Sequence, residues 1–269
     1  MTAIAAPWWS TVRTAAGIAS YDRRAQNKSK VLASAWNVLD PIATMLAYYF
    51  LLVKVFGLRD EGFIFFLFLS ITVHKFAMQG LGRGTSAFVR YKSLVVNGTL
   101  PNKAVVVYAS LIEMLMDLGF GLLIFFASVL LMGTFTSTPH VPTPSVHWVL
   151  LPVLLFGLVA FAAGCIYLLS CVAIYWRDLT NLVQMATRVL LFACPVLYSI
   201  DRFQDNEGAL AIYMLNPLAC YYHMIRGVVL EERWPEPTYL LTAAAFTVGL
   251  LVVGRFVFWR LEGRIGKYW

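Results

Sequence analysis

Charged residues are scarce in this sequence, in which Asp, Glu, Lys and Arg together make up 13% of 269 residues. A soluble domain carries about 25% charged residues, and 60% of this chain is hydrophobic. The composition therefore excludes an ordinary soluble protein and predicts an integral membrane protein. The net charge of +7 does not indicate nucleic-acid binding, because the basic residues flank the apolar segments.

Motifs for cofactors and metals are also lacking. The four cysteines, Cys165, Cys171, Cys194 and Cys220, show no CxxC spacing, so we interpret them as small buried apolar residues. There is no GxxxxGK[ST] loop for ATP phosphates and no HExxH zinc motif. No acidic cluster is suited to holding Mg²⁺ and a pyrophosphate. We therefore expect no metal or cofactor on this chain, which argues against a membrane enzyme such as a polyprenyl transferase or phosphatase.

Long apolar runs dominate what remains. A bilayer core of ~30 Å needs roughly 20 apolar residues per helix, and continuous runs differ from the alternating pattern of a membrane barrel. The sequence predicts an all-α fold with a cytoplasmic segment at 1–33 and a transmembrane domain at 34–269. The six predicted spans are about 34–57, 62–82, 104–132, 148–175, 180–200 and 237–259.

Basic residues set the predicted orientation. They concentrate on the connections that lie inside when both termini are cytoplasmic, as the positive-inside rule requires. The inside residues are Arg13, Arg23, Arg24, Lys28, Lys30, Arg83, Arg90, Lys92, Lys103, Arg177, Arg260, Arg264 and Lys267. The protein is thus predicted to be multi-pass, with its N- and C-termini in the cytoplasm.

The segment 209–230 is apolar enough for a seventh span. A crossing there would carry the basic tail outside, against the charge rule. Asn216-Pro217 interrupts the run and Arg226 lies within it. We therefore predict a broken, re-entrant pair of short helices that dips into the membrane from the outer face, where protein or water covers it.

The N-terminal segment shows helical periodicity. Trp8, Val12, Ala15 and Ala19 recur at helical spacing. This pattern is typical of an amphipathic helix lying along the cytoplasmic interface. The alternative is a disordered tail.

The second cytoplasmic connection is predicted to form one short helix over about 85–96. Phe88, Tyr91 and Leu94 share an apolar face with Val95, and Arg90 and Lys92 lie off that face. An apolar stripe of this kind favours docking into a groove on another protein. The alternative is a helix lying on lipid headgroups.

Two carboxylates lie within the third predicted span. Glu113 and Asp117 are four residues apart and share one helix face, with His74, Lys75 and Arg188 as available partners in neighbouring spans. They are either structural ion pairs facing the bundle interior or a proton relay. The second alternative defines a competing function, a stand-alone proton-coupled carrier.

Two further features have both structural and functional interpretations. Asp178 is suited to capping the N-terminus of the fifth helix. Among the aromatics, Tyr48, Tyr49 and Tyr198 lie in the spans or toward the outer side. Sugar rings stack on aromatic rings, so a saccharide path would be lined in this way. The alternative is the ordinary aromatic belt of membrane proteins.

Taken in order along the chain, the motifs resemble the ABC-2 type permeases of polysaccharide exporters. The resemblance runs from about Tyr21 to the C-terminus. The matching residues are Lys28, Lys30, Leu32-Ala33, Trp36, Asp40-Pro41, Val55-Phe56-Gly57, Leu100-Pro101, Arg177-Asp178, Pro195, Tyr198, Asn216-Pro217 and Arg226. Ala33 and Asp40 depart from the Gly and Asn that are usual in the family.

The resemblance implies a homodimer in the bacterial plasma membrane, with two ABC ATPase subunits that hold ATP and Mg²⁺. It implies a polyprenyl-diphosphate-linked substrate of the O-antigen, teichoic acid or galactan type, with the Ala- and Val-rich sequence favouring galactan. The implied channel is lined by the first and fifth spans of both copies.

Site roles are implied in the same way. For ATPase coupling the resemblance implies Thr85, Phe88, Arg90, Tyr91, Lys92, Leu94, Arg177 and Asp178. It implies a gate helix at the N-terminus where the lipid-linked substrate enters, near Arg23, Arg24, Lys28 and Trp36. These arginines suit a diphosphate, although plain positive-inside topology explains the basic residues equally well. The re-entrant segment, with Asn216, Pro217, Tyr221, Tyr222 and Arg226, is implied to shape the outer exit.

Overall fold

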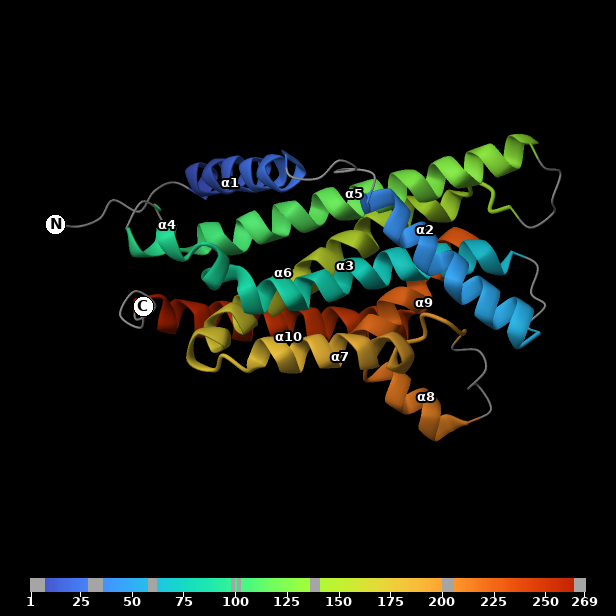
Figure 1. Cartoon of the computed structure of the whole chain (residues 1–269). Coiled ribbons are helices and arrows are strands. Elements are labelled where there is room, and N and C mark those ends of the chain that lie inside the picture. Colours follow the sequence, from blue (N-terminus) through green and yellow to red (C-terminus); the bar gives the residue numbers. More distant parts are fainter. Residues whose placement is uncertain are drawn as a thin grey trace.

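The computed structural model describes residues 8–28, 36–57, 62–97, 100, 103–135, 141–199 and 206–263. These residues form helices and connections and contain no strand, which confirms the all-α prediction (Figure 1). The helices are α1 Trp8–Lys28, α2 Trp36–Tyr49, a π-helical turn η1 Phe50–Val55, α3 Phe63–Arg90, α4 Lys92–Val96, α5 Ala104–Phe135, a 3₁₀ turn η2 Val146–Leu150, α6 Leu151–Tyr175, α7 Leu179–Ala193, α8 Glu207–Met214, α9 Pro217–Leu230 and α10 Pro237–Glu262.

Among the described residues, four helical segments are long and apolar enough to cross a membrane. They are Phe63–Arg90, Ala104–Leu131, Val146–Tyr175 and Pro237–Glu262. The first predicted span is instead α2 followed by the π-helical turn, and the fifth is the 15-residue α7. The predicted fifth helix is too long, because Pro195 favours an extended residue before it and Cys194 is extended at φ −91° and ψ 150°. The six-span count therefore stays a prediction.

Helices α3, α6 and α10 pack closely through glycines. A methyl group on Gly254 of α10 would lie 2.6 Å from the carbonyl oxygen of Gly164 on α6. On the opposite side of α6, a methyl group on Gly84 of α3 would lie 3.2 Å from the Cα of Ile166. Small residues let membrane helices approach until their backbones touch. α6 is thus held between α3 and α10.

Helix α1 packs lengthwise against the first part of α5 (Figure 1). A helix is present here as predicted, and Ala15 and Ala19 are fully buried. Thr11 is also buried, whereas Val12 is exposed, so contact of the predicted apolar face with the membrane interface stays a prediction. The face in contact is narrow because only short side chains let α1 approach α5.

The prediction of one helix over 85–96 is wrong. Helix α3 continues to Arg90, Tyr91 turns the chain, and α4 follows from Lys92 to Val96. Phe88, Tyr91 and Val95 are buried in this chain's own core, where Phe88 stacks on Phe258 of α10 with ring centroids 6.1 Å apart. The apolar stripe that suggested a docking face is therefore largely consumed by internal packing.

The break at Asn216-Pro217 is present as predicted. α8 ends at Met214 and α9 begins at Pro217, and the Asn216 side chain accepts a hydrogen bond of 3.1 Å from the backbone N–H of Leu218. Proline is favoured at the first helical position, where its missing N–H is not needed. A pair of short helices is thus confirmed, whereas its re-entrant course in a membrane stays a prediction.

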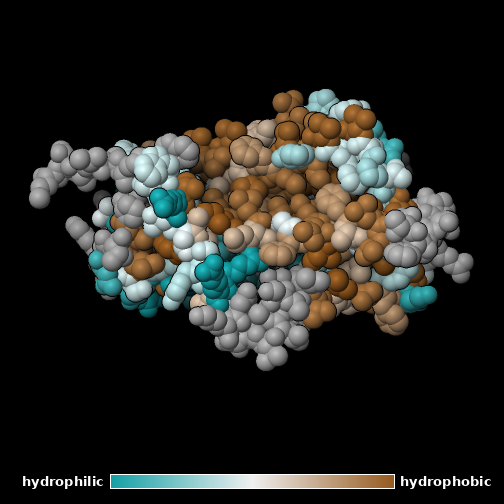
Figure 2. Space-filling view, turned by 90° about the horizontal axis from the view of Figure 1, so that it is seen from above, coloured by the Kyte–Doolittle hydropathy of each residue, from teal (hydrophilic) through white to brown (hydrophobic). Residues whose placement is uncertain are grey.

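The surface is suited to a bilayer. Figure 2 shows a broad apolar area over the middle of one face, with hydrophilic groups toward the ends. The start of α1, the short α4 and the end of α10 lie at the same end of the bundle (Figure 1). Lys92, Arg177 and Arg260 lie near this end, which we call the basic end. Its assignment to the cytoplasm stays a prediction.

Candidate functional site

Glu113 is the buried centre of a cluster of ion pairs near the basic end. Its side chain is on α5 and the residue is 5% exposed. Arg83 of α3 donates to Glu113 Oε2 over 2.8 Å, and Arg90 donates to the same oxygen over 2.9 Å. Tyr91 donates to Oε1 over 3.3 Å. Burial raises the pKa of Tyr91, so its hydroxyl stays a donor.

Asp117 extends this cluster by one turn of α5. Arg83 donates to Asp117 Oδ2 over 2.5 Å, so that one guanidinium holds both carboxylates. Arg23 of α1 lies 3.2 Å from Oδ1 and its guanidinium covers the Phe120 ring at 4.9 Å. We call Arg23, Arg83, Arg90, Glu113 and Asp117 the ion-pair cluster.

The ion-pair cluster confirms the structural interpretation of the two carboxylates and corrects their partners. His74, Lys75 and Arg188 were the expected partners, but they do not contact the two carboxylates. The observed partners are Arg23, Arg83 and Arg90. Arginine cannot be deprotonated in proteins, so each carboxylate faces a permanent positive charge. That arrangement fixes helices to one another and is a poor proton relay.

Helices α5 and α3 are longer than a bilayer core requires. α5 has 32 residues and is about 48 Å long, whereas the hydrocarbon core is ~30 Å thick. α3, with 28 residues, is about 42 Å long. Both helices are therefore longer than the thickness of the apolar layer by roughly ten ångströms or more. Glu113 and Asp117 lie in the half of α5 that is nearer the basic end.

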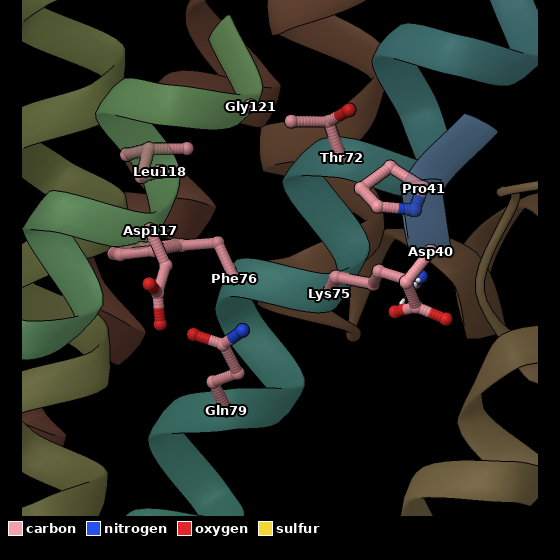
Figure 3. Close-up of a pocket in the computed structure, with 9 residues that line it drawn as sticks. All are labelled: Asp40, Pro41, Thr72, Lys75, Phe76, Gln79, Asp117, Leu118 and Gly121. Carbon is pink, nitrogen blue, oxygen red and sulfur yellow. Dashed lines mark hydrogen bonds and ion pairs between the residues drawn. The ribbon is translucent and has the colours of Figure 1, made fainter. Parts of the chain in front are cut away.

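A second polar site lies deeper, between α2, α3 and α5 (Figure 3). Lys75 of α3 reaches Asp40 Oδ2 of α2 over 2.6 Å and Thr44 Oγ1 over 3.1 Å. A cavity of about 90 Å³ adjoins this pair and extends to Asp117. Two buried oxygens among the described residues, Thr72 Oγ1 and Gln79 Oε1, lack a hydrogen-bond partner and line the cavity. Ordered water commonly satisfies such oxygens, and the cavity is large enough to hold it.

A groove of about 460 Å³ lies between α2, α3 and α7; it has charged and polar groups among apolar side chains, and we call it the polar groove. It shares Asp40, Lys75 and Gln79 with the smaller cavity. From α7 it adds Gln184, Thr187 and Arg188. Arg188 is exposed and forms no ion pair or hydrogen bond with any part of the chain that the structure describes. The groove therefore presents carboxylate, ammonium, guanidinium, amide and hydroxyl groups beside the apolar side chains of Ile71, Met78, Val183 and Leu191.

The predicted outer residues are mostly internal. Tyr221 bonds to Thr247 of α10 over 2.9 Å and Tyr222 bonds to His74 of α3 over 3.2 Å. Arg226 is 2% exposed, covers the Phe66 ring at 4.4 Å and donates to the carbonyl oxygen of Tyr198 over 3.1 Å. These contacts hold α9 inside the bundle.

Tyr198 belongs to the same region, as its hydroxyl contacts Tyr213 Oη and the carbonyl oxygen of Phe192. Tyr48 and Tyr49 are half-buried on α2. The structure thus separates these three predicted channel residues into two groups, one on α2 and one beside α8 and α9.

The remaining predicted site residues lie at the basic end. Arg24 is exposed on α1, and Arg177 and Asp178 are exposed between α6 and α7. The predicted cap is wrong, because Asp178 is in a helical conformation and its side chain makes no cap hydrogen bond. Several residues fall outside the described part of the chain: Lys30, Leu32, Ala33, Pro101, Arg264 and Lys267, and the side chains of Trp8, Lys28 and Trp36.

Sequence reasoning missed the polar groove. Asp40, Lys75 and Arg188 were noticed separately, but their convergence depends on how α2, α3 and α7 pack. The available signal was that each is a lone charge inside an apolar run, which in a membrane span indicates function by default. The described residues contain no group of three His, Cys, Asp or Glu side chains that could hold a metal ion.

No family model matches this sequence. Over almost its whole length the chain is similar to permeases of O-antigen export systems. It is 25% identical over 238 residues to the O-antigen export system permease protein RfbA of Myxococcus xanthus, covering 87% of each chain. It is 22% identical over 253 residues to an RfbA permease of Klebsiella pneumoniae, covering 93% of this chain and 92% of the relative. Against another Klebsiella pneumoniae RfbA it is 21% identical over 243 residues.

These relatives define a class. They are permease subunits of export systems, which are transport components rather than enzymes. The apolar helices and these permeases indicate a protein of the inner membrane. The resemblance to ABC-2 type permeases of the O-antigen export branch, inferred from the motifs, is thereby confirmed.

Proposed function

We propose that this chain is the transmembrane subunit of an ATP-driven ABC exporter that moves a lipid-linked cell-envelope polysaccharide from the cytoplasmic to the outer side of the membrane. The observation that carries the proposal is similarity over 87% to 93% of the chain to O-antigen export permeases. The chain acts as a homodimer with two ATPase subunits, which bind ATP and Mg²⁺. The substrate is a polyprenyl-diphosphate-linked glycan, and galactan is the leading candidate.

The polar groove supports a route for the substrate. It lies between α2, α3 and α7, and α2 and α7 correspond to the predicted first and fifth spans. Facing grooves in two copies would enclose a path lined by polar groups through an apolar layer. Amides and hydroxyls in such a path exchange hydrogen bonds with sugar hydroxyls as the glycan passes.

The basic end supports a site of coupling to the ATPase. α3 runs without interruption from the polar groove to Arg90, where the chain turns into α4. The ion-pair cluster fixes the last turns of α3 to α5 and α1. A push on α4 is therefore transmitted along a rigid helix to Lys75 and the groove.

The competing proton-coupled carrier has less support. It needs Glu113 and Asp117 to release and take up protons during transport. Both carboxylates are held by arginines, and Arg83 contacts the two together. The geometry favours a fixed structural element over a relay.

The test is recovery of the partner. The tagged chain is isolated from its native membrane in mild detergent and its companions are identified by mass spectrometry. We expect an ATPase with a phosphate loop in equal amount, lost in a Val89→Asp, Val96→Asp double variant because both residues are exposed at the basic end. Val149→Asp is the control, since Val149 is also exposed but lies outside that end. Recovery of the wild-type chain without any ATPase, under conditions that preserve ABC complexes, would exclude the proposal.

A further inference from the structure

Arg188 lies at a depth where an unpaired charge needs a reason. It is nine residues after Leu179, so it is about 14 Å along α7 from the basic end. Lys75, which lines the same groove, is twelve residues after Phe63 and about 18 Å from the opposite end of α3. Both cations therefore lie within largely apolar helices rather than at their ends.

The two cations differ in what they contact. Lys75 is occupied by Asp40 at 2.6 Å and by Thr44 at 3.1 Å (Figure 3). Arg188 has no ion-pair partner among the described residues. With Lys75 and Arg188 positive and Asp40 negative, the groove carries one net positive charge. An intramembrane charge is costly unless it faces water or an opposite charge, so the groove is suited to an anion.

We propose that Arg188 is an anion-binding residue in the polar groove and takes the phosphate groups of the lipid-linked substrate during passage. A guanidinium presents a planar fork that binds two phosphate oxygens at once. Gln184 and Thr187 lie beside it on α7 and Gln79 faces it from α3, all lining the same groove. The volume of about 460 Å³ is within the range of ~300–1,000 Å³ typical of small-molecule sites.

Arg188 also offers a site for the diphosphate in place of Arg23. Arg23 was expected to meet the diphosphate, but it contacts Asp117 and covers Phe120. Arg188 carries no such contact within the described chain. The inference rests on the proposed export function, because it names the part of the substrate that the groove recognises.

A binding measurement tests the subsite independently of export. The purified complex in nanodiscs is titrated with farnesyl diphosphate, a short isoprenoid diphosphate, and with phosphatidic acid and farnesol as comparisons. We expect farnesyl diphosphate to bind and farnesol not to bind. Arg188→Gln weakens farnesyl diphosphate about tenfold or more, the loss of a charged hydrogen bond, and Arg188→Lys weakens it less. Arg255→Gln is the control, since Arg255 is an exposed arginine of α10 outside the groove and leaves binding unchanged.

Three outcomes overturn the subsite. Equal affinity of wild type and Arg188→Gln for farnesyl diphosphate would show that Arg188 does not bind the diphosphate. Phosphatidic acid that competes as well as farnesyl diphosphate assigns Arg188 to bilayer phospholipid. Loss of binding together with dissociation of the complex, measured by mass photometry, assigns Arg188 to contact between copies.

The export function is scored separately, by whether deleting the chain stops surface display of the glycan. Display that persists after deletion refutes the export function without changing the binding result. Wild-type binding of farnesyl diphosphate that Arg188→Gln does not alter, in a strain that needs the chain for display, refutes the subsite alone.

Discussion

Arg83 on α3 and Glu113 on α5 form an ion pair of 2.8 Å, and the second terminal nitrogen of the same arginine contacts Asp117. One side chain therefore fixes two carboxylates on successive turns of α5. The fork geometry of arginine makes this possible, whereas a lysine ammonium acts as a single point charge.

Replacing Arg83 is expected to loosen the bundle. Arg83→Gln leaves Glu113 with Arg90 and Asp117 with Arg23 only, so the free energy of unfolding falls by about 2 kcal/mol, as for loss of a charged hydrogen bond. Thermal unfolding can be followed with a thiol-reactive dye, because all four cysteines are buried in the folded chain. Arg255→Gln serves as the control. An unchanged unfolding temperature for Arg83→Gln would mean that the cluster is dispensable for stability.

Close packing of α6 and α10 predicts an effect of a single methyl group. Gly254→Ala would bring a methyl carbon to 2.6 Å from the Gly164 carbonyl oxygen. α10 must move away from α6 to relieve this contact, which is expected to lower the free energy of unfolding by about 1–3 kcal/mol. Gly249→Ala on the same helix meets nothing within 4 Å and is expected to be neutral or slightly stabilising. The same dye assay compares the two. Equal unfolding temperatures would contradict the backbone contact.

Asn216 at the start of α9 and Asp178 at the start of α7 are expected to contribute differently to stability. Asn216→Ala removes a cap hydrogen bond of 3.1 Å to Leu218 and is expected to cost about 1 kcal/mol. Asp178→Ala removes no cap hydrogen bond and is expected to leave stability unchanged. Unfolding temperatures of both variants check this. Impaired export with normal stability in Asp178→Ala would support its implied role in ATPase coupling.

Water in the polar groove can be detected chemically. A cysteine at Gln184 should react with a membrane-impermeant, charged thiol reagent, because the side chain lines a polar groove. Val252→Cys is the comparison, since Val252 is exposed on the apolar surface of α10. We expect much faster labelling at 184 than at 252. Similar rates at the two positions would contradict a hydrated groove.

The sequence by itself determined the helical elements and several of their ends. Long apolar runs must become helices in a bilayer because the backbone has no other hydrogen-bond partners there. Asn216-Pro217 marks the start of α9 through purely local chemistry, and Pro195 ends α7 by its effect on Cys194. The N-terminal helix could be predicted because helical periodicity is local, whereas the packing of Ala15 and Ala19 within the chain was not predicted.

Only the tertiary structure decided which faces meet. Periodicity put Glu113 and Asp117 on one face of α5, but their partners came from α3 and α1, at positions assigned to cytoplasmic connections. The stripe at Phe88 and Tyr91 was recognised, yet whether it met a partner or this chain's own α10 depended on how the helices pack. The polar groove arises in the same way, because Asp40, Lys75 and Arg188 are far apart in the chain and converge only through contacts of α2, α3 and α7.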